Sequence, residues 1–187
     1  IRDWSSDVCS SDLGDAAPLR GFALPRMAAR GTLGAGEARR TLTGSAWVDR
    51  AWGELPTPGA GPIAYDRLLL QFDDGGDLAL LRSRRRDGRG AATVDAVAVG
   101  PEGGGAAAPE LEMTPARAPR RVDGTAFELD WTLRGAGYDL RVEPVLEDQL
   151  HDFAQPMWIG LVRVSGRRDG APVTGLGALQ TAGIGPR

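Results

Sequence analysis

Apolar and polar residues alternate in twos along much of this chain, which is the period of a β-strand with one buried face. The clearest case is the segment 127–133, where Phe, Leu, Trp and Leu alternate with Glu, Asp and Thr. A glycine-rich turn follows at 135–137, and the alternation resumes over 138–142. Strict alternation on both sides of a short glycine turn predicts a β-hairpin.

Further strand-like segments follow one another at short intervals, with turns rich in glycine and aspartate between them. Only the segment 145–153 is expected to hold a helical turn. About ten short strands of this kind predict an all-β domain, and their periodicity alone does not choose between a sandwich and an antiparallel barrel. The other expected strands are 26–33, 40–49, 63–72, 77–85, 91–99, 156–166 and 172–181.

The beginning of the chain is set apart from the fold. Residues 3–13 read DWSSDVCSSDL, which resembles the translation of a sequencing adapter, although a flexible tail rich in serine and aspartate is the alternative. We therefore expect residues 1–13 to be a disordered artefact, 14–23 to be a linker or the end of a missing N-terminal domain, and 24–187 to fold. The sole cysteine, Cys9, lies in this string, so no disulfide or redox argument rests on it.

Charge and composition disfavour several classes of function. The formal net charge is −3, and leaving out residues 1–13, with one Arg and three Asp, brings it to about −1. A nearly neutral domain without a basic patch is a poor nucleic-acid binder. No apolar run is long enough to span a bilayer. A G-x-S-x-G nucleophile elbow is absent, and the lone His151 does not build a zinc site, so we expect no metal and no cofactor.

A series of short motifs occurs in a fixed order between Leu24 and Ile184. They are PRMAARGTL at 25–33, G-x-A-W-x-D-R-x-W-G at 44–53, DDG at 73–75, LLR at 80–82, P-x-x-x-D-Q at 144–149, MWIG at 157–160 and G-x-G at 175–177. In this order and spacing they resemble the C-terminal domain of the carotenoid 1,2-hydratase and AttH-like family of secreted, lipocalin-like proteins.

The resemblance implies a lipocalin-like (calycin-type) antiparallel β-barrel of about 8–10 strands, as the second of two barrels. Closing a sheet into a barrel removes its edge strands and leaves a small interior suited to one apolar ligand. The partners implied are an apolar small molecule and a missing N-terminal barrel of the same chain, with no nucleic acid and no membrane span. The resemblance also implies a periplasmic or secreted location in the bacterial envelope.

Asp49 is the first candidate catalytic acid. Hydration of an isolated double bond needs a proton donor beside an apolar cavity, and burial against tryptophan raises the pKa of a carboxyl group. Asp49 follows Trp47 by two residues, so both side chains are expected on one face of a strand. The alternatives are a buried ion pair with Arg50 or Arg26, or a cap on the following loop.

Asp66 is the second candidate catalytic acid, because it lies beside Tyr65 on a strand otherwise rich in leucine. It is expected to act as an acid or to orient water, with a salt bridge to Arg67 at the barrel rim as the more ordinary alternative. The four tryptophans of the fold are most simply core residues, and lining a cavity is compatible with that because a lipocalin cavity is an incompletely filled core. The candidate ligand-binding residues are Trp47, Arg50, Trp52, Tyr65, Trp131 and Trp158.

Several positions depart from the family pattern. Ala51 replaces a usual acidic residue, Met157 and Ile159 replace the Tyr and Glu of a YWEG-like segment, and 64–67 and 178–184 have also lost polar or aromatic residues. The expected function is therefore the binding of a hydrophobic, lipid- or isoprenoid-like molecule on a hydratase-like scaffold. One alternative is a hydratase- or cyclase-type enzyme with Asp49 as general acid, which would be a hydro-lyase. The other is a non-catalytic structural half of a two-barrel envelope protein.

Overall fold

A computed structural model describes residues 20–52, 63–87, 89–102, 110–122, 124–151 and 156–184. The chain divides into two compact units, Ile1–Leu55 and Pro56–Arg187, and each is described by itself. The adapter-like string with Cys9 lies outside the described residues. The assignment of residues 24–187 to a single barrel domain stays a prediction.

The first unit contains an antiparallel β-hairpin. Its strands are β1 (Arg20–Leu33) and β2 (Arg40–Trp52), joined through a short 3₁₀ turn, Gly36–Ala38. Both strands extend beyond the expected ranges 26–33 and 40–49. The pairing shifts between Leu24 and Met27, where Arg26 has a positive φ of 58°, so β1 carries a bulge close to its Pro25.

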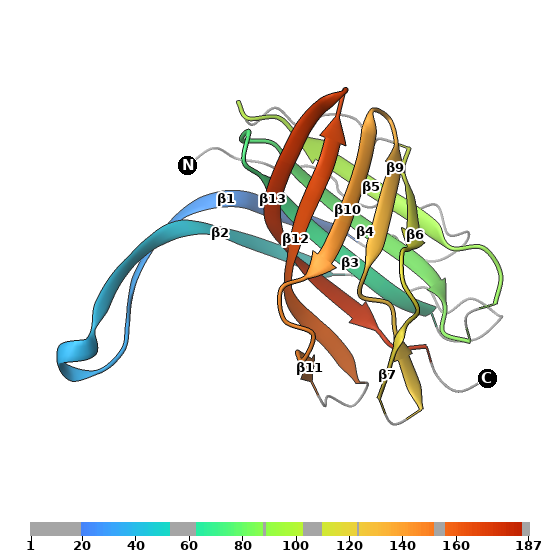
Figure 1. Cartoon of the computed structure of the whole chain (residues 1–187), viewed down its shortest axis with the longest axis horizontal. Coiled ribbons are helices and arrows are strands. Elements are labelled where there is room, and N and C mark those ends of the chain that lie inside the picture. Colours follow the sequence, from blue (N-terminus) through green and yellow to red (C-terminus); the bar gives the residue numbers. More distant parts are fainter. Residues whose placement is uncertain are drawn as a thin grey trace. The chain divides into compact units, whose positions relative to one another are not determined.

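In its described residues, the second unit is a nearly closed, barrel-like antiparallel sheet of nine strands (Figure 1). The strand order is β5-β4-β3-β13-β12-β10-β9-β6, with β11 paired to β12, and β7 and β8 form a separate two-stranded sheet. This confirms the antiparallel, lipocalin-like barrel of 8–10 strands. The strands are β3 (Ile63–Phe72), β4 (Asp77–Arg85), β5 (Thr93–Val99), β6 (Glu112–Pro115), β7 (Arg120–Val122), β8 (Thr125–Phe127), β9 (Trp131–Gly135), β10 (Tyr138–Pro144), β11 (Leu150–His151), β12 (Met157–Arg168) and β13 (Ala171–Ala182).

The turns between neighbouring strands follow from the glycine and aspartate positions. In the β9–β10 hairpin, Gly135 and Gly137 have φ values of 122° and 84°, a region that favours glycine. In the β3–β4 turn, the Asp74 carboxylate accepts a hydrogen bond from the Gly76 backbone N–H at 3.0 Å. β3 and β4 begin and end at the residues that the sequence predicts.

Two expectations about local structure were wrong. The strand expected over 127–133 is split, because β8 ends at Phe127 and β9 begins at Trp131. β8 pairs with β7, whereas β9 pairs with β6 and β10, so the chain changes partners between them. In 145–151, the described part of 145–153, the structure has no helical turn; Leu150 instead pairs with Trp158 to form β11.

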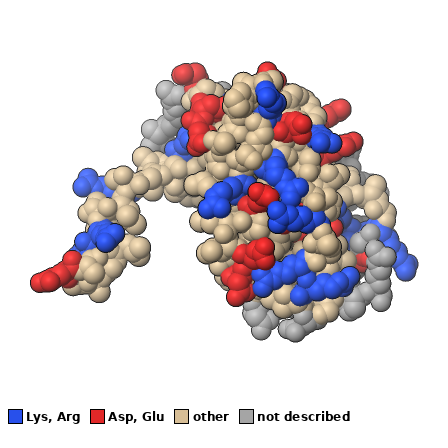
Figure 2. All heavy atoms as spheres, viewed as in Figure 1, with Lys and Arg blue, Asp and Glu red and all other residues tan. Residues whose placement is uncertain are grey.

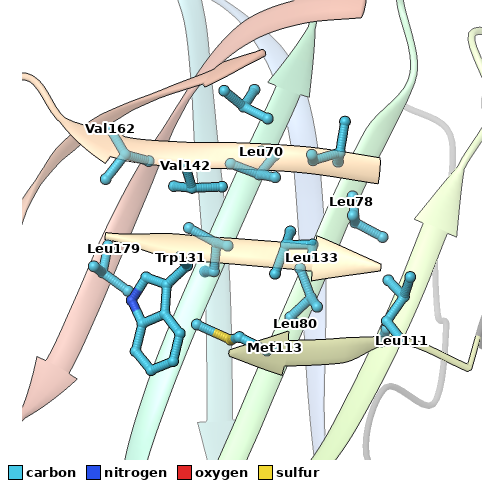
Figure 3. Packing of buried hydrophobic residues seen from close by; sticks show 14 of the residues in the cluster. Leu70, Leu78, Leu80, Leu111, Met113, Trp131, Leu133, Val142, Val162 and Leu179 are labelled. Atoms are coloured by element: carbon cyan, nitrogen blue, oxygen red, sulfur yellow. The ribbon is translucent and has the colours of Figure 1, made fainter. Parts of the chain in front are cut away.

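The core of the second unit is formed by the side chains that alternate onto the inner faces of its strands (Figure 3). Trp131 and Trp158 are 0% and 1% exposed, as the prediction that they are core residues requires. The largest other fully buried side chains are Phe72, Phe127, Leu68, Leu70, Leu78, Leu80, Leu133, Leu140, Leu179 and Val142. The inner face is therefore lined mainly with apolar groups, and any polar side chain placed there requires partners.

Acidic and basic side chains are interspersed on the molecular face drawn in Figure 2. Among the described residues, no helix has the length and apolar character needed to cross a membrane. His151 is exposed.

Candidate functional site

A group of charged and polar side chains interrupts the apolar inner face of the barrel. We call it the interior polar cluster, and it consists of Asp66, Arg82, Arg84, Glu128 and Thr181. Asp66, Arg84 and Thr181 are buried, with 0%, 7% and 0% of their surface exposed. Charged residues are almost never buried to this degree unless they are paired.

The strand register brings three members of the cluster together. Asp66 on β3 lies directly opposite Arg82 on β4 and directly opposite Thr181 on β13. Arg84 is two residues beyond Arg82, so both arginines project from the same face of β4. Asp66 therefore sits between two strands that supply hydrogen-bond donors to it.

Asp66 receives four hydrogen bonds through its two carboxylate oxygens. Oδ2 accepts from Arg82 Nη1 at 2.6 Å and from Arg84 Nε at 2.9 Å. Oδ1 accepts from Arg84 Nη2 at 3.0 Å and from the Thr181 hydroxyl at 2.6 Å. In every one of these contacts the Asp66 carboxyl oxygens are the acceptors.

The position of Asp66 does not match the alternative of a salt bridge to Arg67 at the barrel rim. Asp66 lies inside the barrel, and Arg67 alternates onto the opposite face of β3, where it is half-buried. A carboxylate held by two guanidinium groups is suited to positioning those groups. The assignment of Asp66 as a catalytic residue stays a prediction.

Arg84 uses only part of its hydrogen-bonding capacity. Its Nε and Nη2 face Asp66, and Nη2 also donates to the backbone carbonyl of Ala182. Because the guanidinium group is planar and rigid, Nη1 then projects away from Asp66. Nη1 is buried and has no hydrogen-bond partner within the described structure.

Arg82 connects the buried end of the cluster to its more exposed end. Its Nη1 also donates to Glu128 Oε2, at 3.3 Å, and its guanidinium carbon lies 5.0 Å from the ring centre of Trp131. This is the geometry of a cation–π contact. The side chains of Arg82 and Glu128 are 13% and 15% exposed, so the cluster approaches solvent at this point.

Glu128 is the member of the cluster that sequence reasoning missed. Burial raises the pKa of its carboxyl, nearby Asp66 raises it further, and Arg82 and Arg84 act in the opposite direction. Glu128 thus keeps its proton to a higher pH than a free glutamate does. The sequence places it at a polar position of the alternating segment 127–133, where the solvent-facing side is expected, and nothing in that pattern distinguishes it.

Trp131 and Trp158 differ in whether their indole N–H groups have a hydrogen-bond acceptor. Trp158 Nε1 donates to the Glu147 backbone carbonyl at 2.7 Å, and Trp158 lies opposite Thr181 in the register of β12 and β13. Trp131 Nε1 is buried and has no hydrogen-bond partner in the residues that the structure describes. Figure 3 shows this nitrogen on the side of the ring that is nearer to Leu179. Their role as ligand-binding residues stays a prediction.

Tyr65 lies on the opposite face of β3 from Asp66, so the structure does not bring these two candidates together. Tyr65 is paired across the strands with Ser83, and burial raises the pKa of its phenol. Its contribution to ligand binding stays a prediction.

In the first unit, Trp47 and Asp49 are both half-buried on β2, whereas Val48 and Arg50 between and beside them are exposed. The alternation confirms that Trp47 and Asp49 share a strand face. The side chain of Trp52 is outside the described residues. The roles expected for these residues stay predictions.

Within the described ranges, no group of three His, Cys, Asp or Glu side chains is arranged to hold a metal ion.

Comparison with known proteins identifies the family. The model of the AttH-like family matches residues 19–183. The chain belongs to the AttH-like family. No curated protein matches it.

Two solved structures share the fold of this AttH-like chain. An AttH protein from Nitrosomonas europaea aligns with a TM-score of 0.74 and 21% identity, covering 89% of this chain and 53% of its own. Kievitone hydratase from Nectria haematococca aligns with a TM-score of 0.70 and 21% identity, covering 94% of this chain and 58% of its own. The AttH-like chain therefore spans little more than half the length of these proteins, and at this identity the likeness shows the fold alone.

Proposed function

We propose that the barrel of this hydratase-like scaffold binds a hydrophobic small molecule of lipid- or isoprenoid-like character. The observation that carries the proposal is the composition of its inner face. An extensive apolar surface is combined there with one compact polar cluster and two tryptophans. Binding sites for small molecules are mostly apolar and contain a few placed polar groups that fix the orientation of the ligand.

The energetics of buried charges support a functional origin of the cluster. Replacing a buried ion pair with apolar residues of similar volume is often neutral or stabilising, so a core selected for stability alone has little use for one. Here two arginines and two carboxyl groups interrupt an otherwise apolar interior. The resemblance of the sequence motifs to carotenoid 1,2-hydratases supports an isoprenoid-like ligand.

A fluorescence titration with all-trans-retinol tests this proposal. Retinol is an apolar polyene whose absorption overlaps tryptophan emission, so a molecule bound near Trp131 or Trp158 quenches tryptophan fluorescence. We expect saturable quenching with a stoichiometry of one molecule per chain. Quenching that increases linearly without saturation would contradict a defined site.

Two variants locate the quenching. Trp131→Phe is expected to remove a substantial part of the retinol-induced change, because Trp131 is fully buried on the inner face. Leu176→Gln, which alters a 56% exposed leucine on the outside of β13, is the matched control and is expected to leave the titration unchanged. Loss of saturable binding in Leu176→Gln alone would place the ligand on the outer surface instead.

A second candidate function is a hydro-lyase, the class to which kievitone hydratase belongs by its name. The observation that favours it is Glu128, a carboxyl whose pKa is raised by burial and which shares Arg82 with Asp66 and Trp131. A protonated carboxyl beside an apolar interior is suited to protonating a double bond. Asp49 remains the general acid proposed from the sequence, and Glu128 joins it as a candidate.

The larger assembly is also a proposal. The two solved structures are nearly twice as long as their shared part, which supports a second barrel as a partner for this one. A periplasmic or secreted location follows from the family resemblance alone. A non-catalytic structural role in such a two-barrel protein would leave retinol unbound in the titration.

A further inference from the structure

Two buried N–H groups, one on Arg84 of the interior polar cluster and one on the Trp131 ring that Arg82 contacts, have no hydrogen-bond acceptor among the described residues. One is Arg84 Nη1, on a side chain that is 6% exposed, and the other is Trp131 Nε1, on a residue that is fully buried. A buried donor without an acceptor is energetically costly, so native proteins rarely leave one in place without a reason. Two such donors, connected through Arg82 and Asp66, indicate that an acceptor belongs there.

The two donors belong to one connected set of contacts. Arg84 and Arg82 both bind Asp66 Oδ2, and Arg82 in turn lies over the ring of Trp131. Asp66 thereby fixes the orientation of Arg84, whose Nη1 is turned away from the carboxylate. Leu68, two residues after Asp66 on β3, and Leu179, two residues before Thr181 on β13, are fully buried apolar neighbours on the same strand faces. The donors thus lie where an apolar interior meets a polar group.

The charges of the cluster indicate what kind of acceptor fits. Burial raises the pKa of Glu128, and at a pH high enough to ionise it two arginines and two carboxylates give a formal sum of zero. A carboxylate added to this balanced group would have to give up its hydration without gaining an unpaired positive charge. An uncharged oxygen atom needs only hydrogen bonds, which Arg84 Nη1 and Trp131 Nε1 are free to donate.

We propose that the ligand of this barrel carries an uncharged oxygen acceptor, a ketone or an alcohol, on an otherwise apolar body, and that Trp131 Nε1 and Arg84 Nη1 donate to it. This inference rests on the proposed ligand-binding function and specifies the chemistry of the ligand. Trp131 and Arg84 are then residues that determine specificity, and Asp66 is the positioning residue for Arg84. The side chains of Arg82 and Glu128, 13% and 15% exposed, mark the side on which the cluster reaches solvent.

The test uses three probes of equal chain length, 2-nonanone, nonane and nonanoate, with the full chain labelled with ¹⁵N at its tryptophans. At mildly alkaline pH, 2-nonanone is expected to shift the Trp131 indole proton downfield, and nonane is not. The Trp158 indole proton is the internal control, because its N–H is already donated to Glu147. Trp131→Phe assigns the resonance.

Affinities of the variants provide an independent measurement. Trp131→Phe keeps an aromatic ring but removes the N–H, so it is expected to weaken 2-nonanone binding about three- to tenfold and to leave nonane within about twofold. Arg84→Lys, which keeps a positive charge near Asp66 but lacks Nη1, is expected to act in the same direction. Trp158→Phe is the matched control and is expected to change both affinities equally.

The outcomes separate this inference from the proposed function. If 2-nonanone and nonane both bind but the Trp131 resonance does not move, and Trp131→Phe weakens both equally, the oxygen site is wrong and the ligand-binding function stands. If nonanoate binds more tightly than 2-nonanone, the assignment of an uncharged group is wrong. If none of the three probes binds, the proposed function fails, and the oxygen site fails with it.

Discussion

Replacing Asp66 with alanine is expected to lower the free energy of unfolding by about 3–5 kcal/mol. The substitution removes the acceptor of four hydrogen bonds and leaves Arg84 buried without its carboxylate. An uncompensated buried charge is costly because the apolar interior solvates it poorly. Urea denaturation followed by circular dichroism, with linear extrapolation to water, measures the change.

Asp139→Ala is the matched control for this prediction. Asp139 on β10 also pairs with an arginine, Arg134, at 3.2 Å, but the two side chains are 65% and 70% exposed. Exposed ion pairs contribute about 0–1 kcal/mol, so this variant is expected to stay within about 1 kcal/mol of the parent. An equal loss of unfolding free energy in the two variants would contradict the prediction, because it would show that burial of the interior polar cluster has no energetic consequence.

Replacing Trp131 with alanine is expected to cost a similar amount, about 3–5 kcal/mol. Trp131 is 0% exposed and fills the space between the inner faces of the barrel strands, and its ring also supports Arg82. Truncation loses the buried apolar surface and leaves a cavity that the surrounding strands fill only in part. The same urea experiment measures the effect.

Leu161→Ala provides the comparison for Trp131→Ala. Leu161 lies on β12 and is 60% exposed, so its truncation is expected to change the free energy of unfolding by no more than about 0.5 kcal/mol. A loss below about 1 kcal/mol in Trp131→Ala would mean that Trp131 is not part of a packed interior.

The regular strands were predictable from the sequence because local signals define them. In β3 and β4, apolar alternation leads directly into the turn at Asp73 to Gly76, and the observed bounds agree with the prediction. The break between β8 and β9 was not predictable in this way. Burial continues to alternate through Phe127, Leu129 and Trp131, and only the change of pairing partner, a tertiary property, interrupts the strand.

The interior polar cluster depends on long-range register, which the sequence does not display. Thr181 lies 115 positions from Asp66 along the chain and reaches it only because β13 pairs with β3. Arg82 and Arg84 belong to an arginine-rich stretch that resembles a solvated strand end. The leucine-rich strand identified Asp66 as a candidate. Its hydrogen-bond partners could be identified only from the pairing of β3 with β4 and β13.

The central claim is that the ligand lies inside the barrel, against the inner faces of its strands. Intermolecular nuclear Overhauser effects between 2-nonanone and ¹³C-labelled methyl groups of the protein test it most directly. We expect contacts from the probe to Leu68, Val142 and Leu179, which are fully buried on the inner face. Contacts confined to Leu161 and Leu176, which are exposed on the outer face, would contradict it.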